Sequence, residues 1–113
     1  MKTEIVKIWV SALRSGEYTQ GSKCLLNEQG EYCCLGVLCD LYNKANAPNQ
    51  VLGTFSEGNK QLPTRVMEWA GIATPNAYYD KTSLIQQNDG TEFFPRVSFD
   101  GIATIIERHQ EEL

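Results

Sequence analysis

Residues 33–42 read Cys-Cys-Leu-Gly-Val-Leu-Cys-Asp-Leu-Tyr, the most apolar run in the chain. Wound as a helix from about Cys34 to Lys44, this stretch carries apolar side chains over most of its circumference. A helix that is apolar nearly all round is a buried one. Gly36 costs about 1 kcal/mol of helix propensity relative to alanine, which indicates that another backbone segment passes close to it. The sequence therefore predicts that this helix lies at the centre of the core.

The segments on either side of this helix show helical periodicity and capping residues. Apolar side chains recur with a 3.6-residue period over 3–15, and Gly16 is a natural end for that helix. Pro63 opens a further helix, and Ser83 and Ser98 are suited to cap two more. Outside the central helix, the expected helices cover 3–15, 63–70, 84–88 and the segment from Phe99 onward. Their inner faces are expected to carry Ile5, Val6, Trp9, Val10 and Leu13, then Val66, Trp69 and Ala70, then Phe99, Ile102, Ala103 and Ile106.

Two short runs, 23–26 and 31–33, flank the turn-forming residues Asn-Glu-Gln-Gly and predict a short β-hairpin. Residues 46–61 and 74–82 are rich in loop-forming residues and are expected to be loops. The predicted fold class is α+β and mostly α. Four to five helices surround a buried cysteine-rich central helix, and a short β-hairpin accompanies them. At 113 residues, the chain is expected to form a single compact domain over 1–113.

Composition limits the classes of partner. The net charge is −4, and lysines and arginines are scattered singly along the chain. Binding a nucleic-acid backbone requires clustered cations, so no broad nucleic-acid surface is expected, whereas a compact phosphate-bearing ligand needs only one or two cations. Glu4 and Lys7 interrupt the N-terminal apolar residues, and no run is long enough to cross a membrane. We therefore expect a cytoplasmic protein whose cysteines stay reduced.

The four cysteines, Cys24, Cys33, Cys34 and Cys39, allow three interpretations. A zinc site is disfavoured because its ligands would be adjacent or five residues apart on a helix, unlike paired C-x₂₋₄-C ligands. A nucleophile at the helix start needs a nearby base, yet His109 is the only histidine, and Asp40 on the same helix face would oppose a thiolate. We favour the third interpretation, in which the cysteines are small buried apolar side chains. No metal, no cofactor and no catalytic residues are assigned.

Polar residues in the connecting segments are the remaining candidates for a site. Asn88 and Asp89 precede Gly90, and this triplet suits either a ligand-binding corner or an ordinary helix end. Tyr18 and Gln20 lie in a polar connector over 17–21, where they either line a pocket or face solvent.

Several motifs taken in order support a resemblance. They are Glu-Tyr-Thr-Gln-Gly at 17–21, Cys-Cys-Leu-Gly-Val-Leu-Cys-Asp-Leu at 33–41, Leu-Pro-x-x-Val-x-x-Trp-Ala-Gly at 62–71, Asn-Asp at 88–89 and Ser-Phe-x-x-Ile-Ala-x-x-Ile-Glu at 98–107. This pattern resembles a group of small tailed-phage and prophage proteins that have no assigned activity. Asn-Asp and Ser-Phe are usually close together in that group, whereas residues 90–97 form a longer spacer here. The resemblance implies a phage accessory protein expressed in the host cytoplasm.

By analogy with small acidic phage proteins, we expect a non-enzymatic counter-defence protein. It would capture a small nucleotide-derived immune signal or occlude a host defence protein. The alternatives are a cysteine-dependent hydrolase and a purely structural or regulatory interaction module. A homo-oligomer is compatible with this class, because such proteins often close pockets between subunits. The residues expected to bind the ligand are Tyr18, Gln20, Lys23, Asn88, Asp89, Ser98 and Phe99, with the N-terminus of the last helix offering N–H groups to an anion.

Overall fold

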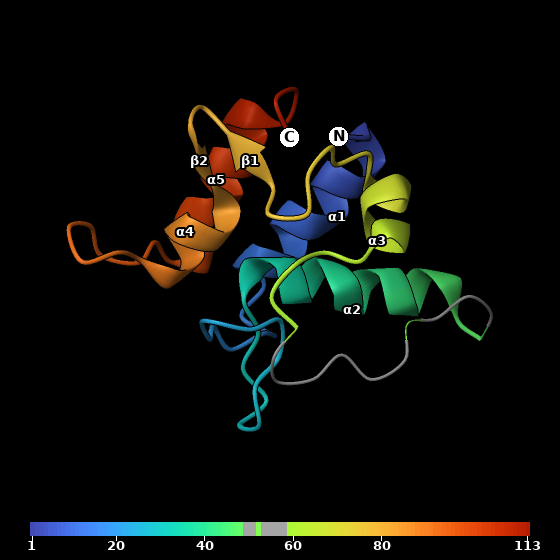
Figure 1. The fold of residues 1–113 in the computed structure, drawn as a ribbon. Coiled ribbons are helices and arrows are strands. Elements are labelled where there is room, and N and C mark those ends of the chain that lie inside the picture. The colour runs from blue at the N-terminus through green and yellow to red at the C-terminus, as the bar shows by residue number, and fades with distance from the viewer. Residues whose placement is uncertain (49–51, 53–58) are drawn as a thin grey trace.

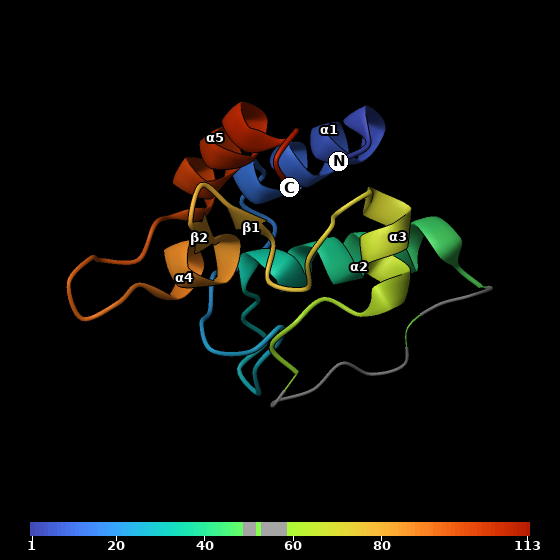
Figure 2. The same cartoon turned by 45° about the horizontal axis from the view of Figure 1, so that its top comes forward.

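The computed structural model describes residues 1–48, 52 and 59–113. The described chain is mixed α+β and mostly helical, as predicted. Its helices are α1 (Thr3–Arg14), α2 (Cys34–Asn46), α3 (Thr64–Ala70), α4 (Leu84–Asp89) and α5 (Phe99–His109), and the strands β1 (Tyr78–Tyr79) and β2 (Thr82–Ser83) form an antiparallel hairpin. Figures 1 and 2 both show α1 and α5 side by side, with α2 crossing beneath them and α3 packed near the C-terminal half of α2.

Helices α1 and α5 bury the faces that the sequence periodicity predicts. The buried residues of α1 are Ile5, Val6, Trp9, Val10 and Leu13, and those of α5 are Phe99, Ile102, Ala103 and Ile106. Burying one such aliphatic side chain contributes about 1.5–3 kcal/mol. Because the two stripes face each other, the two ends of the chain pack into one layer over α2.

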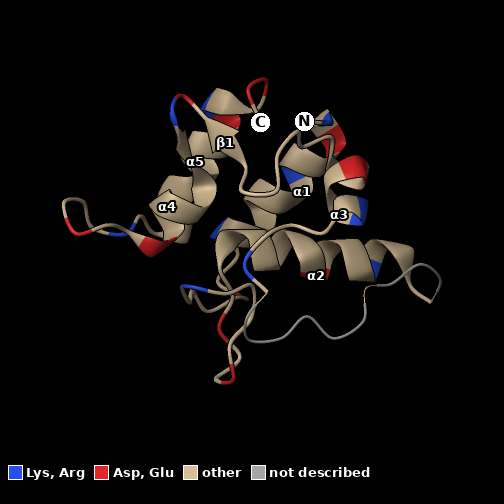
Figure 3. Cartoon of the chain, in the orientation of Figure 1, with Lys and Arg blue, Asp and Glu red and all other residues tan. Residues whose placement is uncertain are grey.

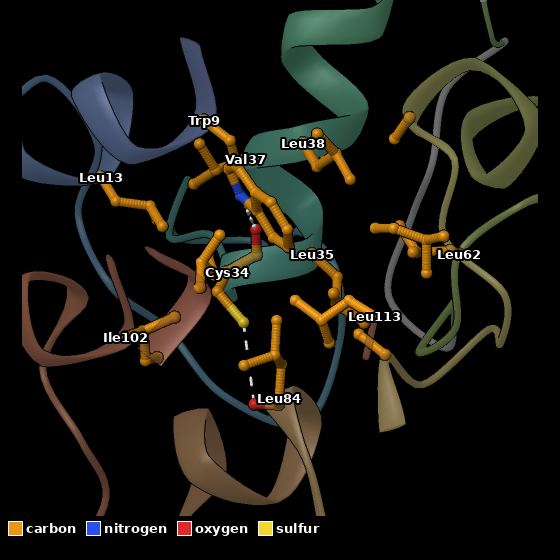
Figure 4. Packing of buried hydrophobic residues seen from close by; sticks show 14 of the residues in the cluster. Trp9, Leu13, Cys34, Leu35, Val37, Leu38, Leu62, Leu84, Ile102 and Leu113 are labelled. Atoms are coloured by element: carbon orange, nitrogen blue, oxygen red, sulfur yellow. Dashed lines mark hydrogen bonds between the residues drawn. The ribbon is translucent and has the colours of Figure 1, made fainter. Parts of the chain in front are cut away.

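Helix α2 is the buried centre of the core, as predicted. Every residue from Cys34 to Cys39 is buried. The indole Nε1 of Trp9 donates to the carbonyl of Cys34 at 3.0 Å, and the Cys34 thiol points to the carbonyl of Leu84 at 3.7 Å (Figure 4). These two contacts join α2 to α1 on one side and to α4 on the other.

The inner face predicted for the helix at 63–70 is correct for Val66 and Ala70, which are buried. Trp69 is only half-buried, and its ring stands edge-on to that of Tyr42 at a centroid distance of 5.5 Å. Gly71 ends α3 with a φ of 73°, and Ile72 donates back to the Met67 carbonyl at 2.9 Å. These two features form a Schellman ending.

The close backbone approach predicted at Gly36 is confirmed. A Cβ at this position would lie 1.8 Å from the carbonyl oxygen of Leu25. The Leu25 carbonyl accepts from Cys33 N at 3.2 Å, and Leu25 N donates to the Asn59 carbonyl at 2.7 Å. The missing side chain at Gly36 thus lets two loop segments reach the N-terminus of α2.

The position predicted for the β-hairpin was wrong. Residues 23–26 and 31–33 meet in a single antiparallel bridge, Leu26 with Tyr32, and form no strands. The backbone of Tyr32 instead pairs with the 17–21 connector, accepting from Gly21 N at 2.7 Å and donating to the Thr19 carbonyl at 2.8 Å. The 31–33 segment therefore pairs with one segment on each of its two edges, and neither pairing extends into a ladder.

The two-stranded hairpin lies within 74–82, which was expected to be a loop, and extends to Ser83. Asp80 and Lys81 form its turn with φ values of 40° and 66°. Two central residues with positive φ match the right-handed twist of paired strands. Asp adopts this conformation readily but Lys does not, which explains why the sequence gives only a weak turn signal.

The expected 46–61 loop falls largely outside the described residues, which omit 49–51 and 53–58. Its first residue, Asn46, belongs to α2. In the part that is described, Leu52 N donates to the Asn43 side chain at 2.6 Å. Among the described helices, none has the length and apolar character needed to cross a membrane.

Candidate functional site

The four cysteine side chains are free and buried. Burial raises the pKa of Cys33 to about 11 and of Cys39 to about 12, and it raises the pKa of Cys34 well above its usual value. The Cys33 thiol accepts from Gly36 N at 3.4 Å, as an N-cap of α2. This hydrogen bond lowers the pKa of Cys33, but by less than burial raises it. The carboxylate that raises the pKa of Cys33 is Asp89, and not Asp40 as we expected. Asp40 instead raises the pKa of Cys39.

We expect these thiols to resist alkylation in the folded protein. With a pKa near 11, roughly one Cys33 thiol in ten thousand is ionised at neutral pH, and iodoacetamide reacts with the thiolate. Mass spectrometry should find Cys33, Cys34 and Cys39 labelled only as fast as the chain unfolds, and labelled rapidly once denaturant restores a pKa of about 8.5. Rapid labelling of Cys33 in the native protein at neutral pH would support the hydrolase alternative.

Asn88 is a fully buried polar residue that joins three segments of the chain. Its Oδ1 accepts from Cys34 N at 3.1 Å and from the Gln20 amide at 3.0 Å. Its Nδ2 donates to the Gly21 carbonyl and to the Asp89 carboxylate, both at 2.9 Å. The side chain has no group left for a ligand, so its role in the described structure is to hold the connector and α2 against α4.

The structure places Gln20 beside Asn88 and the start of α5. The Gln20 amide nitrogen also donates to the Val97 carbonyl at 2.8 Å, and its Oε1 accepts from Phe99 N at 3.1 Å. Ser98 caps α5 by accepting from Gly101 N at 3.3 Å. Gln20, Asn88, Ser98 and Phe99 thus lie together in the structure. Their polar groups engage one another, however, and the predicted anion position at the start of α5 is taken by Gln20.

Tyr18 lies against α2 instead. Its hydroxyl donates to Asp40 at 2.5 Å and accepts from Lys44 at 3.2 Å. Partial burial and the neighbouring Asp40 carboxylate raise the pKa of Tyr18, so it stays a neutral phenol at physiological pH. Its ring packs edge-on to Tyr32. Tyr18 therefore anchors the connector to α2 and stands apart from the Asn88 network.

The other two predicted residues, Lys23 and Asp89, line a hollow at the N-terminus of α2. This inner hollow has a volume of about 110 Å³ and shares Lys60 and Ile85 with an outer hollow of about 710 Å³. We call the two together the lysine groove. Its inner part is lined by Lys23, Cys24, Cys33, Lys60, Ile85 and Asp89, and its outer part by Leu25, Asn59, Lys60, Gln61, Leu62, Pro63, Asn76 and Ile85.

The lysine groove contains polar groups without partners in the described structure. The Oδ1 of Asn76 is buried and accepts no hydrogen bond there. Within residues 1–48, 52 and 59–113, no carboxylate lies within ion-pair distance of Lys23 or Lys60. Lys23 also has a left-handed backbone with a φ of 71°, a conformation that costs a lysine roughly 1–2 kcal/mol. The inner end of the groove therefore has two lysines and one carboxylate, Asp89, and the outer wall includes Asn76, whose Oδ1 is buried.

Sequence reasoning missed Lys60 and Asn76. Neither residue belongs to a motif, and both come from loop segments that only the fold brings to α2. The hydrogen bond from Leu25 N to Asn59 and that from Leu62 N to Pro75, at 2.9 Å, assemble these segments. No local signal in the sequence indicates either contact.

A larger hollow of about 890 Å³ lies between α1 and α5, and its lining includes Val6, Val10 and Arg14. Arg14 there is already paired with Asp100 and Glu107. None of the residues predicted to bind a ligand lines this hollow. Within the described ranges, no three metal-ligating side chains lie close enough to hold an ion.

These elements and hollows define a small, mostly helical α+β protein with a polar groove beside its central helix. The chain belongs to the family described as a domain of unknown function (DUF8296), which matches residues 1–110. Neither the curated proteins nor the solved structures contain a match to it.

Proposed function

We propose that this protein is a non-enzymatic binding protein that captures a small nucleotide-derived anion in the lysine groove. One observation carries the proposal. Lys23 and Lys60 line a single inner hollow, and no carboxylate of the described chain pairs with either amine. A lysine ammonium is a frequent partner of phosphate, and the two lysines together with the Asp89 carboxylate leave the inner hollow one net positive charge, which matches a phosphodiester.

The rest of the groove suits the remainder of such a ligand. The outer hollow of about 710 Å³ is within the range of small-molecule sites and combines apolar side chains with amide groups. Asn76 lines this hollow, and its side-chain amide would bond to the edge of a base. Asp89, on the inner wall, would accept from a sugar hydroxyl.

The biological setting of the proposal comes from the resemblance to small phage and prophage proteins. A phage protein that holds a cyclic nucleotide signal keeps that signal from the host enzyme that responds to it. The proposed role is therefore counter-defence by sequestration in the host cytoplasm. Occlusion of a host defence protein, or a structural or regulatory interaction, would not depend on Lys23 and Lys60.

Calorimetry against cyclic dinucleotides and cyclic ADP-ribose isomers tests this function. We expect one ligand to bind with a dissociation constant on the order of 1 µM. Lys23→Ala and Lys60→Ala should each weaken it by about 10- to 100-fold, the equivalent of one charge-assisted hydrogen bond. Lys81→Ala removes an exposed lysine from the β1–β2 turn and should leave the affinity unchanged.

Three outcomes would contradict the proposal. The absence of heat with every ligand removes sequestration, and binding that is insensitive to both groove lysines removes the assigned site. Mass spectrometry of the recovered ligand tests the non-enzymatic part, because a capturing protein returns the ligand intact and a hydrolase does not.

A further inference from the structure

The segment between α4 and α5, residues 90–97, exposes two adjacent aromatic side chains. Phe93 is 80% exposed and Phe94 is 73% exposed. Figures 1 and 2 show this segment projecting away from the rest of the molecule. We call it the Phe loop. Two large apolar rings in contact with water are costly, and such patches mark interaction sites.

The Phe loop is held in this form by its own hydrogen bonds. Thr91 Oγ1 accepts from Phe93 N at 3.2 Å and from Phe94 N at 3.1 Å, and Thr91 N donates to the Phe94 carbonyl at 2.8 Å. At its base, Val97 N donates to Gln87 at 2.7 Å. Because the backbone is already fixed, docking of the rings loses little conformational entropy.

The same face contains a hollow beside the rings. Its volume is about 630 Å³, and its walls are Thr82, Gln86 and Gln87 together with Phe loop residues that include both phenylalanines and Val97. The two projecting rings also form part of the wall of this hollow, so the rings of a second copy would pack against them there. Such self-complementarity defines an isologous two-fold interface.

The charges flanking the rings favour the same partner. Glu92 precedes the phenylalanines and Arg96 follows them, and both side chains are exposed, so the loop carries both signs of charge (Figure 3). A two-fold axis brings residue i of one copy to residue j of the other and j to i. When two Phe loops pair antiparallel, Glu92 of each copy therefore meets the partner's Arg96.

We propose that the protein forms a two-fold dimer through the Phe loop. Phe93 and Phe94 of each copy enter the partner's hollow, and the Glu92–Arg96 pairs flank them on both sides. Fully burying a phenylalanine removes about 150–250 Å² from water, so four rings supply roughly half of the 1,200–2,000 Å² of a standard interface. The dimer is consequently a weak one, with a dissociation constant on the order of 10 µM. No residue of this hollow lines the lysine groove, so the dimer does not depend on the proposed ligand.

Sedimentation velocity of the full chain, from about 1 to about 300 µM, tests the dimer. The mass should rise with concentration from the 12.7 kDa monomer to twice that value. The double variant Phe93→Ser/Phe94→Ser should sediment as a monomer throughout. Ile8→Ser, which alters a 40% exposed apolar side chain on α1, should dimerise like the wild type. A wild type that stays monomeric, or a double variant that still dimerises, would overturn the proposal.

A charge-exchange experiment tests the antiparallel pairing itself. Glu92→Arg places two arginines at each end of the dimer, and Arg96→Glu places two glutamates there. Each single variant should therefore weaken dimerisation by at least about 10-fold. An equimolar mixture of the two variants restores opposite charges at both ends and should form a heterodimer. Arg96→Glu also removes a hydrogen bond to Gln20, so circular dichroism must show that both variants are folded. A mixture that associates no better than its components would exclude this arrangement.

Discussion

Replacing Asn88 with alanine is expected to lower the free energy of unfolding by about 4 kcal/mol. The variant leaves Cys34 N and the Gly21 carbonyl without their partner inside the core, and each such group costs roughly 1–3 kcal/mol. It also frees the Gln20 amide and opens a small cavity at a site with no exposure to solvent. The melting temperature should fall by about 15 °C.

Urea unfolding followed by circular dichroism measures this loss. Asn46→Ala is the matched control, because Asn46 makes one bond to Tyr42 at the end of α2 and is only half-buried. The control should lose less than about 1 kcal/mol. Asn88→Asp keeps the shape and the acceptor but loses the donor to Gly21 and places a carboxylate beside Asp89. It should be at least as unstable as Asn88→Ala near neutral pH. If Asn88→Ala and Asn46→Ala lower the free energy of unfolding by the same amount, the buried hydrogen-bond network around Asn88 contributes little to stability.

Replacing Gly36 with alanine is expected to destabilise the protein by about 3 kcal/mol or more. Helix propensity alone predicts the opposite sign, a gain of about 1 kcal/mol. The sign reverses because the new Cβ would lie 1.8 Å from the Leu25 carbonyl oxygen and 2.7 Å from its carbonyl carbon. Both are backbone atoms held by Cys33 N and the Asn59 carbonyl, so they have little freedom to move aside.

The comparison for Gly36→Ala is Gly101→Ala in α5. There the added Cβ meets chiefly a methyl group of the Val97 side chain, at 2.6 Å, and a half-buried side chain can shift. We expect Gly101→Ala to cost less than half as much as Gly36→Ala in the same urea titration. A Gly36→Ala protein as stable as the wild type would mean that the 23–25 segment does not lie against α2 in solution.

The helices could be predicted from the sequence because their signals are local. The 3.6-residue stripe of α1, the apolar run at the start of α2 and the serine caps at Ser83 and Ser98 each lie within a few residues of the structure that they specify. The β-hairpin could not be placed in this way. Tyr32 also pairs with the connector at Thr19 and Gly21, and a turn signal at 27–30 contains no information about that distant partner.

The candidate site was predictable only in part for the same reason. Apart from Tyr18, the polar residues singled out in the sequence do gather near the N-terminus of α2, yet most of them bond to one another. Considered singly, Gln20 and Asn88 have the polar groups that a binding site needs. In the structure these groups bond to other residues of the chain, so both residues have a structural role. Lys60 and Asn76 reach the groove through contacts between distant segments, so their role depends on tertiary structure.

The position of Gln20 bears on how this protein can diversify. Its one amide group bonds to Asn88 before the Phe loop, to Val97 at the last position of the loop and to Phe99 after it. The two ends of the loop are therefore held by a residue outside it, and of the loop residues only Val97, at its base, takes part in these bonds. Lengthening such a closed surface loop costs little free energy. Insertions between Asn-Asp and Ser-Phe can consequently accumulate while the core stays the same, which makes this segment a place where related chains can acquire different partners.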